Sequence, residues 1–190
     1  MKMDAVKETT KIVGAVIVRS HPAGTIDRYT ALKAEGKIEE AQALIHAGEV
    51  KVRQKNMIVW SLNYGFDILI QFLLSAYTGS FAFASTLGIA WGEIGTGVTT
   101  PMNTDIALTT PTKRAPISYA ADNGFNLAQI QFFFPDALLA NTTYNEFGTF
   151  IGGSSTIGTG NMFNHALFGT PYSKSAGTDT TVEVDFAFSN

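Results

Sequence analysis

The 190-residue chain contains no cysteine, and this absence excludes both a disulfide framework and a thiolate metal site. Charged residues are scarce, at 15% of the sequence, and lysine and arginine form no dense cluster. Nucleic acid is therefore not expected as a partner, because proteins that bind it carry a concentrated basic patch. Apolar residues make up 45% of the chain, so it is expected to bury a core rather than to be disordered.

An uninterrupted apolar run long enough to cross a membrane is also missing. The most apolar stretch, residues 58–77, contains Asn63, Asp67 and Gln71. An aspartate at the centre of a membrane helix costs about 2.5–3.5 kcal/mol, so this stretch is predicted to be a buried helix. The N-terminal sequence MKMDAVKETTK mixes both charges and lacks the apolar core of a secretory signal. No membrane partner is expected.

The charges that are present divide the chain in two. Residues 1–60 hold ten basic and seven acidic residues, whereas residues 61–190 hold three basic and nine acidic residues. This division predicts an N-terminal strand and helix arm over residues 1–55 and a separate body over residues 56–190.

Within the N-terminal part, the β-branched run over residues 12–19 predicts a strand that enters a turn. Residues 27–46 are rich in helix formers with apolar residues at helical spacing, which predicts two short helices or one kinked helix. Gly36 is the expected break and Gly48 the expected C-terminal stop. Residues 50–60 alternate loosely and are predicted to form a returning strand.

The body is mainly β in its pattern, with short apolar runs separated by turn residues. The predicted strands are 81–90, 117–121, 125–134, 144–151, 161–168 and 180–188. This spacing is typical of an antiparallel β-sandwich, jelly-roll-like, around one buried helix. In the last run, Val182, Val184, Phe186 and Phe188 lie on one face, with Glu183 among the residues on the other.

The segment from Gly95 to Arg114, GTGVTTPMNTDIALTTPTKR, is the most distinctive part of the chain. Gly95 and Gly97 can take positive φ and Pro101 fixes its own φ, so a sharply turned loop is predicted. A phosphate-binding loop needs a lysine directly after its last glycine, but the first lysine here is Lys113. No nucleotide or other cofactor is expected.

Side chains suited to catalysis or metal binding are not grouped in the sequence. His21, His46 and His165 fall in different predicted elements, and each is interpreted as a surface or packing residue. Glu146 lies inside an aromatic strand, where a carboxylate costs free energy unless it is paired. We expect a structural role for it, bonded to Arg114 or to backbone amides. No catalytic residue and no metal site are predicted.

The aromatic residues, 22 in all, favour sheets and subunit interfaces. Consecutive side chains of a strand point to opposite faces, so Phe132, Phe133 and Phe134 are predicted to supply both the core and a subunit interface. A sugar-stacking platform is the alternative interpretation.

Several motifs in order resemble a family of tailed-bacteriophage structural proteins. The segment from Gly95 to Arg114 is similar to the family's GTGTTxP, DTAL and closing-arginine signature. Residues 143–150 (TYNEFGTF), 161–168 (NMFNHALF) and 181–188 (TVEVDFAF) resemble its later strands, and residues 59–74 resemble its helix entry. The similarity covers residues 56–190. The acidic residue that often precedes the family's arginine is absent here.

This resemblance implies a non-enzymatic virion protein of the tail, fibre or capsid-decoration kind. Such a protein associates with copies of itself and docks on other virion structural proteins of the capsid, neck or tail. The fold-marker residues carried over are Gly95, Gly97, Pro101, Asp105, Arg114, Glu146 and Gly148. Asp105, Arg114 and Glu146 are the candidates for an inter-strand ion pair. The alternative function is an adhesin module of the phage particle that binds a host surface glycan.

Overall fold

The computed structural model describes residues 11–58, 88–122 and 127–189. In chain order the elements are β1 (Lys11–Pro22), α1 (Thr25–Ala34), α2 (Ile38–His46), β2 (Glu49–Ile58), β3 (Ile89–Gly95), β4 (Pro111–Asp122), β5 (Leu127–Phe134), β6 (Thr143–Ile151), β7 (Asn161–Ser173) and β8 (Thr178–Ser189).

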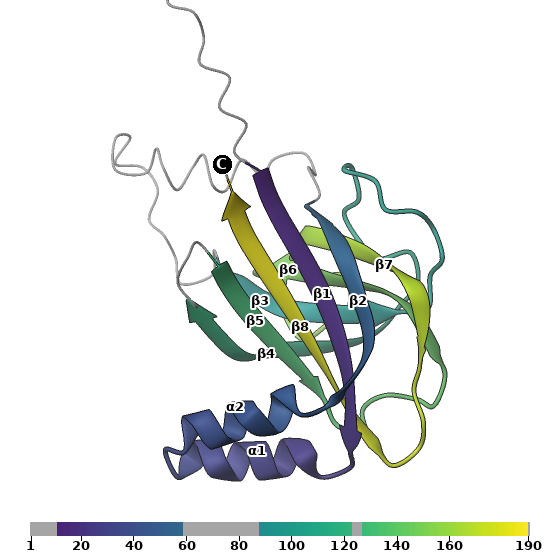
Figure 1. Cartoon of the computed structure of the whole chain (residues 1–190). Coiled ribbons are helices and arrows are strands. Elements are labelled where there is room, and N and C mark those ends of the chain that lie inside the picture. The colour runs from purple at the N-terminus through teal and green to yellow at the C-terminus, as the bar shows by residue number, and fades with distance from the viewer. Residues whose placement is uncertain (1–10, 59–87, 123–126, 190) are drawn as a thin grey trace, which may run out of the picture.

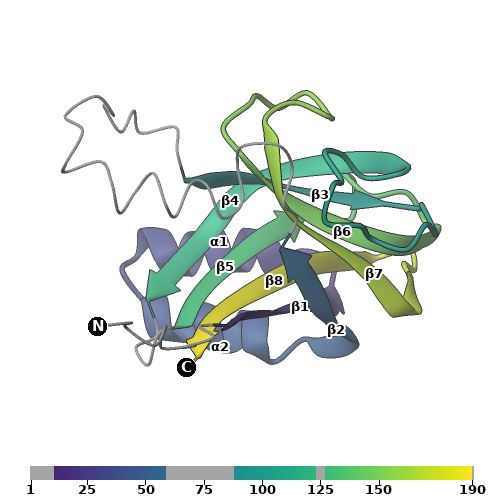
Figure 2. The same cartoon turned by 90° about the horizontal axis from the view of Figure 1, so that it is seen from above.

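The eight strands in the described residues form one antiparallel sheet that closes into a barrel in the order β1-β2-β7-β6-β3-β4-β5-β8. The longest pairing joins β1 and β8, which match from Lys11 and Ser189 to Pro22 and Thr178. The shortest joins β2 and β7 at only two residue pairs. Figures 1 and 2 show β1, β8 and β5 on one side of the barrel, crossed by β3, β6 and β7.

The barrel interior is filled by alternate side chains of the strands. Those buried there include Val16, Val18, Ile94, Phe132, Phe134, Phe147, Phe168, Val182, Val184 and Phe186. Gly92 of β3 lies where two of these rings meet, because a Cβ atom at Gly92 would come within 2.6 Å of Phe147 and 2.7 Å of Phe132. Large rings on the facing strands therefore depend on a glycine in β3.

A helical hairpin connects β1 to β2 and covers part of the outer surface. Ile26 and Tyr29 of α1 and Ile45 of α2 pack against Phe133, which points outward from β5. The Tyr29 and Phe133 rings meet edge to face with their centroids 4.7 Å apart. Figure 1 shows the two helices side by side at one end of the barrel.

The hairpin also buries polar groups on the outer face of β8. Glu183 is 2% exposed. Its carboxylate lies 3.1 Å from a guanidinium nitrogen of Arg19 and 3.2 Å from Nε2 of His46, and it accepts a hydrogen bond of 3.0 Å from Gln131. The alternation predicted for β8 is confirmed for its apolar side, but the opposite side is covered here by the hairpin rather than facing solvent.

The mainly β, antiparallel character expected from the sequence is confirmed, and so are the two short helices. The closed strand order replaces the two stacked sheets of a sandwich, which are not confirmed. The segment predicted to be an arm, residues 1–55, supplies β1 and most of β2 to the barrel itself. The predicted buried helix at 58–77 and most of the strand at 81–90 lie outside the described residues.

The aromatic run in β5 belongs to the core. Phe132 and Phe134 are fully buried inside the barrel, and Phe133 is 8% exposed under the helices. The core part of the interpretation is therefore confirmed, whereas the side chain expected at a subunit interface, Phe133, is covered by the chain's own helices. The run offers no free platform for a sugar.

Substitution of Phe132 by alanine should lower the free energy of unfolding by about 3–5 kcal/mol, because it removes a fully enclosed ring and leaves a cavity. Urea unfolding followed by circular dichroism measures the change. Val50→Ala is the control, since Val50 is 47% exposed and its loss should change stability by less than about 0.5 kcal/mol. Equal effects from the two substitutions would contradict the assigned core.

Candidate functional site: a surface loop held by a buried carboxylate

The connection between β3 and β4, residues 96–110, folds back along the outer face of the barrel (Figure 1). A backbone hydrogen bond of 3.0 Å from Thr96 to Thr110 closes its base. Leu108 packs with Phe150 and Met162, which form a small apolar cluster outside the main core. We call residues 96–110 the anchored loop.

Glu146 of β6 is the centre of the contacts that hold the anchored loop. It is fully buried. Its Oε1 atom accepts hydrogen bonds from the backbone N–H groups of Gly97 (3.0 Å) and Thr110 (2.7 Å). Its Oε2 atom accepts one from the N–H of Thr109 (3.1 Å) and lies 3.1 Å from Nε2 of His165. Both ends of the loop therefore depend on one carboxylate.

His165 of β7 links this carboxylate to a second acidic residue. Its Nδ1 atom lies 2.7 Å from Oδ2 of Asp105, while its Nε2 atom faces Glu146. A ring with a carboxylate at each nitrogen satisfies both only as the imidazolium, which donates from both nitrogens. Asp105 also accepts a hydrogen bond of 2.8 Å from the N–H of Met102. The chain of contacts thus reaches from β6 to the middle of the loop.

The pKa values follow from these contacts. Burial by itself lowers the pKa of His165, but hydrogen bonds to Glu146 and Asp105 and their negative charges outweigh it and raise the pKa above its usual 6.5. Burial raises the pKa of Glu146, but the bonds from His165 and from the amides of Thr110 and Thr109 hold it below its usual value. The charged form of both groups is favoured.

Three glycines leave the space that the carboxylate and the loop occupy. A Cβ atom at Gly97 would lie 2.4 Å from Oε1 of Glu146, and one at Gly95 would lie 2.6 Å from the same atom. A Cβ at Gly148 would come within 3.1 Å of Leu108. Gly95 and Gly97 are not among the glycines with positive φ. The positive φ expected at Gly95 and Gly97 is therefore not adopted, and close approach is the physical reason for a glycine at both positions.

Arg114 belongs to a separate buried pair. Its Nη1 atom lies 2.5 Å from Oε1 of Glu93, directly across the β3/β4 pairing, and its guanidinium rests 5.1 Å from the centre of the Trp91 ring and 4.9 Å from that of Phe150. Glu93 also accepts a hydrogen bond of 2.8 Å from the N–H of Gly158. This pair holds the loop that follows β6.

The predicted fold-marker residues therefore divide into two groups. The first group meets around the anchored loop and consists of Gly95, Gly97, Asp105, Glu146 and Gly148. The second is Arg114, which pairs with Glu93. Pro101 lies in the loop and is not part of either hydrogen-bonded group. The expectation that backbone amides satisfy Glu146 is confirmed, whereas its pairing with Arg114 is wrong, because the cross-strand register gives Arg114 to Glu93.

The sequence does not predict the roles of two members of these pairs, His165 and Glu93. His165, expected to be a surface or packing residue, is buried at 1% exposed, and it also forms two ionic contacts that the sequence does not predict. Glu93 was not singled out. Glu93 and Glu146 are both acidic residues in apolar strands, and such a position indicates a buried ion pair. The identity of the partner depends on the strand register, which the sequence does not show.

The anchored loop presents apolar side chains to solvent. Val98 is 73% exposed, Met102 is 59% exposed and Ile106 is 69% exposed. They alternate along the loop with the groups that hold it, Gly97, Asp105 and Thr109 among them. The loop is thus tied down by its polar groups while its apolar side chains project outward.

The polar contacts of this site hold the anchored loop against the barrel. Both ring nitrogens of His165 face carboxylates, so the histidine has no free nitrogen for proton transfer to a ligand. In the part of the chain that the structure describes, no group of three or more histidine, aspartate or glutamate side chains is placed to hold a metal ion. Within those same residues, no helix has the length and apolar character to cross a membrane.

The fold and the site define a β-barrel protein with a surface loop that is hydrogen-bonded to the barrel and exposes apolar side chains. No family model, curated protein or solved structure matches the chain.

Replacement of Glu146 by glutamine should lower the free energy of unfolding by about 3–5 kcal/mol, because it leaves a buried histidine without one of its charge partners. Urea unfolding of the purified chain measures this loss. Glu49→Gln provides the matched control, since the carboxylate of Glu49 is 70% exposed beside Lys51 and an exposed pair contributes little. Equal stability of the Glu146 variant and the parent would contradict the anchoring role.

The pH dependence of stability provides a second test. Because the folded-state pKa of His165 is raised, its contribution is complete below its unfolded pKa of 6.5 and is lost as the pH rises through the folded value. The parent should therefore lose more stability than His165→Gln on going from about pH 6 to about pH 9. The comparison cancels the contribution of His21, which is common to both proteins. Parallel pH profiles would contradict the ionic role of His165.

Proposed function

We propose that this chain is a non-enzymatic bacteriophage virion structural protein, which associates with copies of itself and docks on the capsid, neck or tail. The observation that carries the proposal is the anchored loop, an ordered surface segment whose apolar side chains are held outward by a buried ionic network. This loop is also the segment that resembles the signature of tailed-phage structural proteins.

A surface loop that is ordered before binding reduces the entropic cost of association. Apolar side chains that project from a mobile loop lose conformational freedom when they enter an interface, which reduces affinity. In the anchored loop this ordering is already provided on folding by Glu146, His165 and Asp105. Val98, Met102 and Ile106 are therefore preorganised contacts for another protein surface. Repetition around a symmetry axis multiplies such contacts in an assembly.

The antiparallel barrel supports a structural role in a second way. Its closed strand order limits edge-to-edge addition, among the described strands, to the seam where β2 and β7 share only two residue pairs. Away from that seam, association is directed to side-chain surfaces. A sandwich or jelly-roll body, as expected from the sequence, would limit edge-to-edge addition in the same way if its edge strands were covered. The proposed role is therefore compatible with either fold.

The glycan-binding alternative has less support. The large hydrophobic side chains that are exposed in the described residues are aliphatic or methionine: Ile38, Val50, Val98, Met102, Ile106 and Ile157. Sugars stack on aromatic rings, and none of these side chains provides one.

Substitution of Val98, Met102 and Ile106 by serine should weaken self-association by at least about tenfold without loss of the fold, because each side chain is exposed and the network beneath it is retained. Size-exclusion chromatography with light scattering over a concentration series measures association, and circular dichroism checks the fold. Mass spectrometry of purified phage particles measures incorporation.

The matched control replaces Ile38 and Val50 by serine, since these side chains are exposed on other elements. It should associate as the parent does. A parent chain that stays monomeric at high concentration and is absent from purified particles would overturn the proposed function. If the triple substitution leaves the oligomer unchanged, the interface between copies lies outside the anchored loop.

A further inference from the structure

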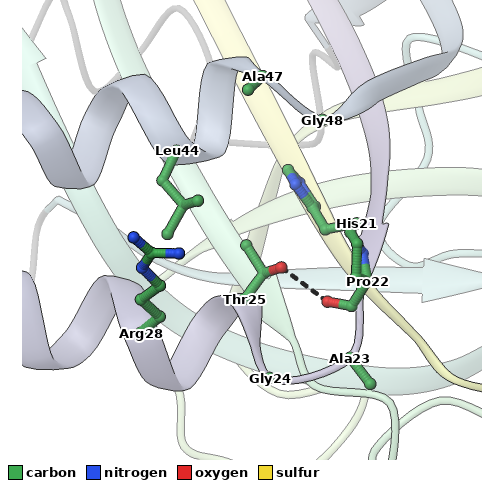
Figure 3. A pocket seen from close by; sticks show the side chains of 9 residues that line it. All are labelled: His21, Pro22, Ala23, Gly24, Thr25, Arg28, Leu44, Ala47 and Gly48. Carbon is green, nitrogen blue, oxygen red and sulfur yellow. Dashed lines mark hydrogen bonds between the residues drawn. The ribbon is translucent and has the colours of Figure 1, made fainter.

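A pocket of about 360 Å³ lies at the base of the helical hairpin, between the end of β1, the start of α1 and the end of α2. Its walls include His21, Gly24, Thr25, Arg28, Leu44 and Gly48 (Figure 3). It is separate from the anchored loop and shares no residue with the network around Glu146.

Arg28 supplies the positive charge of this pocket. It is exposed, and it is the only acidic or basic residue in the lining besides the histidine. Among the described residues it has no carboxylate partner, whereas Arg19 pairs with Glu183 and Arg114 pairs with Glu93. Figure 3 shows its guanidinium extending from α1 toward Leu44 of α2.

His21 supplies a nearly enclosed polar group. It is 3% exposed, and its ring lies against the backbone of Gly48, where an added Cβ would fall 2.0 Å from Cε1. Its Nε2 atom lies 2.9 Å from Oγ1 of Thr181. Its Nδ1 atom has no hydrogen-bond partner among the described residues, and it is not one of the fully enclosed polar atoms. This nitrogen is therefore open to a ligand.

The charge state of His21 makes Nδ1 suitable as a donor without a buried positive charge. Burial lowers its pKa below 6.5, nearby Arg19 lowers it further, and Asp179 opposes them in part. These effects favour the neutral ring at pH 7. When Thr181 donates its hydroxyl proton to Nε2, the remaining proton resides on Nδ1.

The start of α1 does not itself provide the anion site. The N–H of Ile26 already donates to Oδ2 of Asp179 at 3.0 Å, and the hydroxyl of Thr25 donates to the carbonyl of Pro22 at 2.7 Å, the bond drawn in Figure 3. Among the side chains that line the pocket, the donors that remain are those of Arg28 and His21. Leu44 and Ala47 add an apolar wall beside them.

We propose that this pocket binds a small ligand that carries an oxyanion, a carboxylate or a phosphate. The guanidinium of Arg28 contributes the charge-assisted hydrogen bonds, and the Nδ1–H of His21 contributes a neutral one. The carbon part of the ligand packs on Leu44. Ligand binding in this pocket does not require self-association, so a test of the pocket does not depend on the outcome for the proposed function.

Nuclear magnetic resonance of the full chain tests this assignment. The ring signals of His21, identified with His21→Gln, are followed during titration with sodium phosphate, sodium acetate and sodium chloride at matched ionic strength. Saturable shifts with phosphate or acetate, and a rise of the His21 pKa in their presence, support the site. Saturation by phosphate alone assigns a phosphate ligand, and saturation by acetate alone assigns a carboxylate.

Arg28→Gln should weaken the saturable binding by at least about tenfold, since it removes the charged donor. Arg28 is exposed, so the variant is expected to fold. Arg53→Gln, an exposed arginine of β2, is the matched control and should leave binding unchanged. Equal shifts with chloride and with both oxyanions, or unchanged binding by Arg28→Gln, would overturn the proposal.

Discussion

The buried carboxylate of Glu146 is the constraint on which the surface of this barrel depends. A charge without water is costly unless several donors surround it, and here three backbone amides and a histidine do so. Three of these donors lie in the residues that leave β3 and enter β4, so the carboxylate is satisfied only when the loop lies against the barrel. Folding of the loop and burial of the charge are thereby one event.

Much of the local structure could be predicted from the sequence, because it depends on short patterns. The alternation in β8 and the helix formers between Gly36 and Gly48 indicate their elements directly. The closure of the sheet could not be predicted, since it depends on β1 pairing with β8 across almost the whole chain. The charge difference between the two parts of the chain predicts separate regions, but β1 of the N-terminal part pairs with both β2 and β8 and is one strand of the barrel.

The candidate site was predictable in most of its members, His165 and Glu93 excepted, but not in its pairs. Glycines at 95 and 97 and a glutamate in an aromatic strand indicate close packing around a buried charge, and the structure brings these residues together. The strand register decides which cation pairs with which carboxylate. In the β6/β7 register His165 lies opposite Gly148 and close to Glu146. In the β3/β4 register Arg114 lies opposite Glu93. A sequence without register carries neither assignment.

The central claim is that the Glu146 carboxylate holds the anchored loop, and amide hydrogen exchange tests it most directly. The N–H groups of Gly97, Thr109 and Thr110 donate to that carboxylate. They should exchange slowly in the parent chain, at rates near those of the barrel strands, and rapidly in the glutamine variant at position 146. Rapid exchange of all three amides in the parent chain, while the strands remain protected, would contradict the account.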